Sequence, residues 1–276
     1  MTARTLLITG CSSGIGLDAA QHMTARGWRV FATARQPADV DRLTAMGLEA
    51  LPLDVTDPGS IAAALDQVSA RAGRLDALFN NAAFAIPGAL EDVPAEAMRH
   101  IFDTNLIGLH ALTRAVIPMM RAQGGGRIVM CSSVLGLVGM AWRGAYVASK
   151  YALEGYSDVL RIEMAPANIH ISLIEPGPIT SAFRRNARAQ FDRWIDWPAS
   201  PRADQYRAEL VPRLHAATEG KDRFELGPEA VTARLVHALE SRRPRARYYV
   251  TTPTWIMGGL RRILPTRALD ALIARY

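Results

Sequence analysis

Cysteine is scarce in this 276-residue chain, and long apolar runs are absent. The two cysteines, Cys11 and Cys131, lie far apart and have no spacing typical of metal ligands, and the six histidines form no ligand pattern either. This usage fits free thiols in a reducing compartment, so we expect a cytoplasmic protein without a metal site. No stretch approaches 18 consecutive apolar residues, which argues against a transmembrane helix. The apolar segment 5–9 is too short for a secretory signal.

Lysine is equally rare, because Lys150 and Lys221 stand against 30 arginines. In such a chain a lysine at position 150 hints that a compact ammonium matters there. The net charge is +6, and residues 241–276 alone hold eight arginines and one aspartate. A nucleic-acid-binding protein would more often spread basic residues along a groove with interleaved aromatics, so we expect no nucleic-acid partner. This basic tail could lie on a membrane surface, pack on the substrate loops or a neighbouring subunit, or stay solvated, and we favour packing.

Apolar strands alternate with helical patterns along most of the chain. Strands are expected at 5–9, 29–34, 48–53, 75–79, 127–131, 169–174 and 247–250, and helices at 18–26, 38–46, 61–72, 95–120, 144–165 and 228–240. This alternation predicts an α/β fold with a doubly wound parallel sheet of about seven strands and helices on both faces. The simplest division is one domain over residues 1–276, with an insertion at about 180–227 and a helical tail at 251–276.

A glycine-rich turn follows the first expected strand and precedes a helix. It contains Gly10, Gly14 and Gly16, with three residues between the first two glycines. Glycines at this place let the backbone approach a pyrophosphate, while the helix N-terminus offers free N–H groups. The same sequence is also compatible with a plain turn from strand to helix, so the motif alone leaves both interpretations open.

Tyr146 and Lys150 are four residues apart on an expected helix and therefore share one face. An ammonium beside a phenol favours its ionised form, although a shift from about 10 to near neutrality needs roughly three pKa units. A nearby ammonium supplies part of this shift, and a cationic cofactor ring could supply more. The same spacing is also common on solvated helix faces.

Six motifs occur in one order along the chain. They are Thr-Gly-x-x-x-Gly-x-Gly from Thr9, Asn80-Asn81-Ala82, Asn105, Ser133, Tyr146-x-x-x-Lys150 and Pro176-Gly177. Together they resemble the short-chain dehydrogenase/reductase family, in the branch of hydroxysteroid and retinol dehydrogenases, over about residues 5–250. The resemblance implies a Rossmann-like fold, a hydrophobic small-molecule substrate and a homo-oligomer, either a dimer or a tetramer.

The resemblance also implies catalytic roles. Tyr146 would be the general acid in carbonyl reduction and the general base in alcohol oxidation. Ser133 would bind the substrate oxygen, whereas Ser132, one residue earlier on the strand, would point the other way. Lys150 would hold the nicotinamide ribose and lower the pKa of Tyr146. Asn105 would anchor a water through its backbone in a proton relay, or would simply be a locally satisfied polar residue.

The end of the second strand bears on cofactor choice. Ala34 and Arg35 stand where NAD-dependent enzymes place an acid, so we predict NADP(H), unless Arg35 is only a solvated residue. The full set of expected cofactor-binding residues is Gly10, Ser12, Ser13, Gly14, Ile15, Gly16, Arg35, Asp54, Val55, Asn81, Ala82, Tyr146, Lys150, Pro176, Gly177, Ile179 and Ser181. Two small residues depart from the family pattern, Cys11 in the turn and Ala83 after Ala82, and only local adjustment is expected.

Mainly apolar residues are expected at the pocket mouth. They are Phe84, Ile86, Pro87, residues 134–142 and the aromatics of the insertion. They suggest a hydrophobic alcohol, ketone or aldehyde. An equal alternative is that Trp142, Phe183, Trp194 and Trp197 only pack a lid. The leading hypothesis is an NADP(H)-dependent oxidoreductase, and the alternative is a non-catalytic NADP(H)-binding sensor or scaffold.

Overall fold

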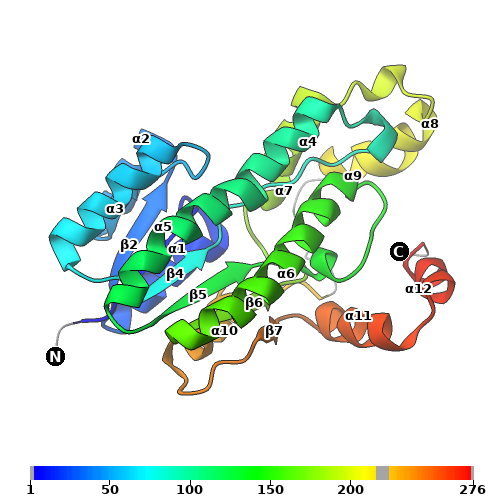
Figure 1. Ribbon diagram of the computed structural model, residues 1–276. Coiled ribbons are helices and arrows are strands. Elements are labelled where there is room, and N and C mark those ends of the chain that lie inside the picture. Colours follow the sequence, from blue (N-terminus) through cyan, green and yellow to red (C-terminus); the bar gives the residue numbers. More distant parts are fainter. Residues whose placement is uncertain (1–2, 216–223, 275–276) are drawn as a thin grey trace.

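A single parallel sheet of seven strands forms the centre of the computed structural model, which describes residues 3–215 and 224–274 (Figure 1). The strand order is β3-β2-β1-β4-β5-β6-β7. The strands are β1 (Thr5–Ile8), β2 (Arg29–Ala34), β3 (Glu49–Pro52), β4 (Ala77–Asn80), β5 (Gly126–Cys131), β6 (Ile169–Glu175) and β7 (Arg247–Tyr249). The predicted Rossmann-like α/β fold is confirmed, with the order reversing between β1 and β4 as expected for a doubly wound sheet.

Helices cover both faces of this sheet (Figure 1). They are α1 (Gly14–Ala25), α2 (Pro37–Ala45), α3 (Pro58–Ala72), α4 (Ala95–Phe102), α5 (Leu109–Ala122), α6 (Gly144–Met164), α7 (Phe183–Trp194), α8 (Ala203–Gln205), α9 (Val211–His215), α10 (Glu229–Glu240), α11 (Thr252–Ile263) and α12 (Thr266–Ile273). Residues of α1, α2 and α10 share one hydrophobic cluster with the sheet, and residues of α3, α5 and α6 share the other.

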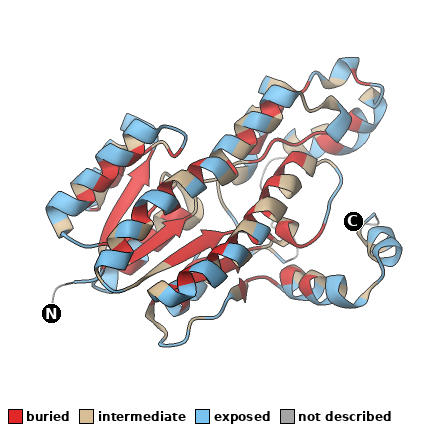
Figure 2. Ribbon diagram, in the orientation of Figure 1, coloured by how far each residue is buried: buried red, intermediate tan, exposed pale blue. Residues whose placement is uncertain are grey.

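The alternation of side chains along each strand creates these two clusters. On β1, Leu6 and Ile8 enter the cluster with α1 and α10, whereas Leu7 enters the cluster on the opposite face. All three side chains are fully buried, because helices cover both faces of the sheet. Figure 2 shows the strands as buried ribbons between helices with exposed outer faces.

One helix expected at 95–120 is interrupted. Residues Asp103–Gly108 form a π-helical turn between α4 and α5. At Gly108 a Cβ would lie 2.6 Å from the backbone oxygen of Val55, so only glycine fits this close approach. π-turns inside α-helices occur often at functional sites, and this one carries Asn105.

The segment after β6 forms a lid over the carboxyl end of the sheet. Helices α7, α8 and α9 lie in the predicted insertion 180–227, and residues 216–223, with Lys221, lie outside the described residues. A third hydrophobic cluster joins this lid to Tyr146 and to the segment after β4. The aromatic residues named for the lid belong to this cluster: Trp142, Phe183, Trp194 and Trp197. Packing of the lid is thus one role of these residues.

The tail forms α11 and α12, which separate at Pro265. Arg261 of α11 donates to the backbone oxygen of Gly136 at 3.3 Å, so the tail contacts the loop that follows β5. Within residues 3–215 and 224–274, no helix is long and apolar enough to span a membrane. The division into one domain with an insertion and a tail stays a prediction.

Candidate active site

Tyr146 and Lys150 lie on α6 and point into the protein rather than into solvent. Their exposed fractions are 8% and 1%. Nζ of Lys150 donates to the backbone oxygen of Cys131 at 2.7 Å and lies 5.5 Å from the centroid of the Tyr146 ring. Because Cys131 ends β5, this hydrogen bond fixes the ammonium at the carboxyl edge of the sheet. The pair is therefore built into a buried site.

Burial shifts the pKa values of both groups towards their neutral forms. It raises the pKa of Tyr146, and the nearby Ser133 hydroxyl opposes this shift through a hydrogen bond. Burial likewise lowers the pKa of Lys150, and the nearby Glu154 carboxylate opposes this shift. In the chain alone, burial of Tyr146 thus outweighs its hydrogen bond with Ser133, and acidification of the phenol needs further positive charge in the site.

Ser133 is the second residue after β5 and caps the short 3-10 helix Val134–Gly136. Its Oγ accepts from the backbone N–H of Leu135 at 3.1 Å, which leaves its O–H available as a donor. The neighbouring Ser132 has different contacts, and its orientation away from the site stays a prediction. A Cβ added at Gly136 would meet Ser132 Oγ at 2.7 Å and Glu154 Oε1 at 3.1 Å, so these two polar atoms border Gly136.

Asn105 is fully buried and ties the π-turn to the segment after β4. Its Oδ1 accepts from the Phe84 N–H at 3.1 Å, and its Nδ2 donates to the Phe84 oxygen at 2.9 Å. Nδ2 also donates to Ser149 Oγ at 3.1 Å, and that hydroxyl donates to the backbone oxygen of Tyr146 at 2.8 Å. The side chain of Asn105 is thus a brace between two walls of the site, while the water relay through its backbone stays a prediction.

The glycine turn forms a narrow cradle before α1. Gly10 and Gly14 have φ values of +72° and +55°, which favour glycine. A Cβ at Gly16 would lie 2.3 Å from the Gly10 oxygen and 2.7 Å from Asn81 Nδ2. The same Nδ2 donates to the Thr9 and Gly10 oxygens at 3.0 and 3.1 Å. Asn81 thus fixes the cradle, and the free N–H groups at the start of α1 suit a pyrophosphate.

Thr9 was missing from the predicted site residues, although it opens the glycine motif. Its Oγ1 accepts from the N–H groups of Asn81 and Ala82, both at 2.9 Å. Because strands β1 and β4 are neighbours in the sheet, this hydroxyl holds the glycine turn against the Asn-Asn-Ala segment.

The segment after β6 approaches the same cradle. A Cβ at Gly14 would lie 2.7 Å from Cβ of Ser181, so these two predicted cofactor residues are in contact range. A Cβ at Gly177 would lie 2.1 Å from Oγ1 of Thr251, so Gly177 is confined against the start of α11. Ile179 forms an isolated parallel bridge with Leu226, which holds this segment beside the described end of the insertion.

Two arginines border the end of β2. Arg35 is exposed and directly follows the strand, and the structure places Asp54, the other predicted residue at this edge, in a turn where it accepts from Thr56. The sequence did not single out Arg42 of α2, whose Nη2 donates to the backbone oxygen of Ser12 in the glycine turn. It also pairs with Asp39 at 2.9 Å. Arg42 thus brings a second cation to the phosphate cradle.

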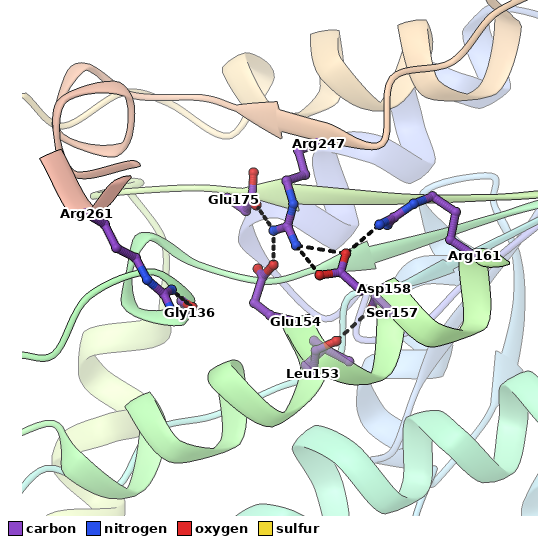
Figure 3. A network of polar contacts seen from close by, with 9 residues as sticks. All are labelled: Gly136, Leu153, Glu154, Ser157, Asp158, Arg161, Glu175, Arg247 and Arg261. Carbon is purple, nitrogen blue, oxygen red and sulfur yellow. Dashed lines mark hydrogen bonds and ion pairs between the residues drawn. The ribbon is translucent and has the colours of Figure 1, made fainter. Parts of the chain in front are cut away.

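A partly buried ionic network centred on Arg247 was not predicted from the sequence (Figure 3). Arg247 of β7 donates through Nη1 to Glu154 of α6, and to Glu175 of β6 at 2.7 Å. Its Nη2 donates to Asp158 at 2.8 Å. Burial is the main cause that raises the pKa of Glu154 and raises that of Glu175 to about 8. Glu154 lies one turn after Lys150 on α6, and Glu175 directly precedes Pro176. The network therefore supports both α6 and the segment after β6, which border the site.

A doubly wound sheet with a glycine cradle and a buried Tyr-Lys pair defines a class of dinucleotide-dependent oxidoreductases. The short chain dehydrogenase family matches residues 4–192. The chain is 42% identical over 272 residues to the uncharacterized oxidoreductase YbbO of Escherichia coli K12, covering 98% of this chain and 94% of that protein. It is 36% identical to human retinol dehydrogenase 8 over 88% of this chain and 80% of that protein.

A solved structure agrees with these relatives. The Burkholderia phymatum short chain dehydrogenase/reductase in complex with NAD has a TM-score of 0.78 and 25% identity, over 98% of this chain and 95% of that chain. This protein therefore belongs to the short-chain dehydrogenase/reductase family of oxidoreductases, which bind a nicotinamide cofactor.

Proposed function

We propose that this protein is an NADP(H)-dependent oxidoreductase that transfers a hydride between nicotinamide and the hydroxyl or carbonyl carbon of a hydrophobic alcohol, ketone or aldehyde. The observation that carries the proposal is the buried pair Tyr146 and Lys150 beside Ser133, at the same sheet edge as the glycine cradle. The site fits the cofactor because close packing at Gly14 and Gly16, where a Cβ would meet neighbouring protein atoms, shapes a narrow turn at the start of α1, whose free N–H groups suit a pyrophosphate.

The side chains have distinct roles in this proposal. The cofactor supplies or accepts the hydride, and the protein supplies position and a proton. Tyr146 gives a proton to the substrate oxygen in reduction and takes it back in oxidation. Ser133 donates its hydroxyl hydrogen to the same oxygen. Lys150 binds the nicotinamide ribose and, with the positive charge of the oxidised ring, opposes the burial that raises the pKa of Tyr146. Asn105 braces the wall and anchors the proton relay.

The other contacts follow the predicted set. Ser12, Ser13 and Ile15 line the cradle with its glycines, Asp54 and Val55 meet the adenine, and Asn81 and Ala82 border its ribose. Pro176, Gly177, Ile179 and Ser181 face the nicotinamide side. The approach of Ser181 to Gly14 supports this arrangement, because it brings the two ends of the cofactor site together.

The preference for NADP(H) rests on charge at the end of β2. Arg35 follows the strand, no acid stands beside it in the segment 34–36, and Arg42 contacts the cradle through Ser12. Two guanidinium groups favour a 2′-phosphate over a 2′-hydroxyl. The Burkholderia relative contains NAD, so the cofactor must be tested directly.

The substrate class is inferred from the lid. The ring of Phe183 lies 5.4 Å from that of Tyr146, centroid to centroid, and the surrounding cluster is apolar. The name of the relative retinol dehydrogenase 8 denotes a hydrophobic alcohol, which is in line with this lining. We also propose that the protein is cytoplasmic. We further propose a homo-oligomer, either a dimer or a tetramer, and sedimentation of the purified protein would test this oligomeric state.

The test is turnover of a panel of hydrophobic ketones, aldehydes and secondary alcohols, followed through NADPH absorbance and repeated with NADH. We expect turnover with NADPH at lower cofactor concentration than with NADH. The competing function is a non-catalytic NADP(H) sensor or scaffold, which the intact set Asn105, Ser133, Tyr146 and Lys150 disfavours. Tight NADPH binding without turnover across the whole panel would support that sensor instead.

A further inference from the structure

Arg143 is a half-buried cation at the entrance to the active site. It is the residue directly before α6 and lies three positions before Tyr146. Residues three apart at the start of a helix lie on one side of it, with Cβ atoms about 5–6 Å apart. Its backbone forms an isolated bridge with Gly88, in the segment that follows β4. Arg143 is thus anchored between two segments that border the expected substrate mouth.

The charge of Arg143 has no counter-ion in the part of the chain that the structure describes. Its guanidinium donates through Nη1 to the backbone oxygen of the preceding Trp142, at 3.1 Å. That oxygen also accepts from the Gly88 N–H at 3.0 Å. Glu209 of the lid accepts instead from the indole N–H of the neighbouring Trp142, at 3.0 Å. A desolvated guanidinium without a carboxylate is costly and is rarely retained for packing alone.

The electrostatic surroundings increase this cost. Burial lowers the pKa of Arg143 to about 10, and the positive charges of Arg213 and Arg184 add to the effect. Arg184 starts α7 and Arg213 belongs to α9, so two lid helices bring further cations towards Arg143. The free N–H groups at the start of α6 also favour an anion over a cation at this end of the helix. Arg184 itself pairs with Glu225 at 3.4 Å, so the charge that a bound anion would neutralise is that of Arg143.

The neighbouring backbone shows that this position is not a relaxed turn. Trp142 has a φ of +63°, in the left-handed region that bulky residues rarely adopt. Its ring packs on Tyr206 of the lid, with centroids 4.7 Å apart. Trp142 therefore contacts the lid through its ring and fixes the backbone at the start of α6. Arg143 is held at a defined place one turn from the phenol.

We propose that Arg143 binds the carboxylate of an otherwise apolar substrate, so that the preferred substrates are hydroxy acids and oxo acids. The inference rests on the proposed function, because it places the reacting carbon at Tyr146 and the carboxylate at Arg143. The apolar cluster of the lid holds the aliphatic chain between them. Arg213 of α9 adds positive charge near the carboxylate.

The test compares straight-chain methyl ketones with oxo acids that carry a carboxylate in place of the terminal methyl group. The readout is the ratio of kcat/KM for each oxo acid to kcat/KM for its matched ketone. We expect this ratio to exceed one in the native enzyme at some chain length and to fall at least about tenfold in Arg143→Met, because a charge-assisted hydrogen bond is lost. Arg143→Lys should retain part of the ratio.

The matched control is Arg185→Met, which removes one exposed arginine from the same lid helix and changes the net charge equally. It should leave the ratio unchanged. An equal fall in the ratio for Arg185→Met and Arg143→Met would show a general charge effect and would overturn the proposal. A ratio that does not respond to Arg143→Met would overturn it as well.

A binding measurement separates this proposal from the proposed reaction. In Tyr146→Phe protein saturated with NADPH, tryptophan fluorescence reports binding of straight-chain carboxylic acids and of the corresponding alcohols. Tighter binding of the acids that disappears in Tyr146→Phe/Arg143→Met supports the carboxylate site even if no ketone is turned over, in which case only the reaction fails. Equal affinities for acids and alcohols would exclude the site whatever the activity.

Discussion

Glu175 Oε1 lies 2.7 Å from Nη1 of Arg247, inside the protein and next to the Pro176–Gly177 segment (Figure 3). The same guanidinium also pairs with Glu154, so two buried carboxylates share one Nη1 group. The pKa of Glu175 is raised to about 8, first by burial and then by the charge of Glu154, while Arg247 opposes the shift. The folded protein therefore favours a proton on this pair near neutral pH.

This pair makes stability depend on pH. A carboxyl whose pKa is higher in the folded state than its ordinary value of 4.5 stabilises the fold at low pH, and this contribution is lost as the pH rises through about 8. We predict that the free energy of unfolding falls between about pH 5 and pH 8 by roughly 1–3 kcal/mol more in the native protein than in Glu175→Gln. Urea denaturation at several pH values measures this, with the exposed Glu163→Gln of α6 as control. Parallel curves for native protein and Glu175→Gln would contradict the prediction.

Replacement of Asn105 should damage the fold around the site. Asn105→Ala leaves the buried N–H and oxygen of Phe84 without their present partners, and we expect a loss of roughly 2–4 kcal/mol in unfolding free energy. Ser149→Ala removes a single contact of Asn105 and should cost less. Thermal and urea unfolding of both variants test the order. Similar small losses in both would mean that Asn105 is not a brace.

Gly177 should tolerate no side chain. In Gly177→Ala the new Cβ collides with Oγ1 of Thr251, so the segment must shift, at a cost of roughly 1–3 kcal/mol. We expect weaker NADPH binding and a lower melting temperature. The double variant Gly177→Ala/Thr251→Ala should recover part of both, and Gly139→Ala, with no atom within 4 Å of its Cβ, should change neither. No recovery in the double variant would show that this clash is not the cause.

Cofactor choice should depend on the two arginines near β2. We predict that Arg35→Ser and Arg42→Ser each weaken NADPH binding about tenfold and leave NADH binding nearly unchanged, because only NADPH carries the 2′-phosphate. Arg71→Ser on α3 is the control of equal charge. Fluorescence titration with both cofactors measures the affinities. Equal losses for NADPH and NADH would mean that the arginines shape the cradle but do not select the phosphate.

Much of the fold could be predicted because its signals are local. The strand over 29–34 was predicted with the observed bounds, since apolar residues between two turns identify a strand without knowledge of its neighbours. The interruption at Asp103–Gly108 could not be predicted in this way. It depends on the approach of Gly108 to the Val55 backbone, which two distant segments create together.

Prediction of the candidate site from the sequence has the same limit. Tyr146, Lys150, Ser133 and Asn105 belong to spaced motifs, and the structure brings all four to the carboxyl edge of the sheet region around β5. Three further residues belong to no motif: Arg42, Glu175 and Arg247. Their contacts could not be predicted, because each is made with a partner 30 to 93 residues away in the chain. Arg143 was also missed, because its proposed role depends on the lack of a counter-ion among the described residues 3–215 and 224–274, which a sequence does not reveal.

The central claim is that Tyr146 delivers the proton while the cradle and Lys150 bind the cofactor. The most direct test measures NADPH affinity and ketone turnover on the same preparation of Tyr146→Phe. The phenyl ring preserves the packing against Phe183 but has no proton to give. We predict NADPH affinity within about threefold of the native value and a loss of turnover of at least about a hundredfold. Turnover that stays at the native level would contradict the account.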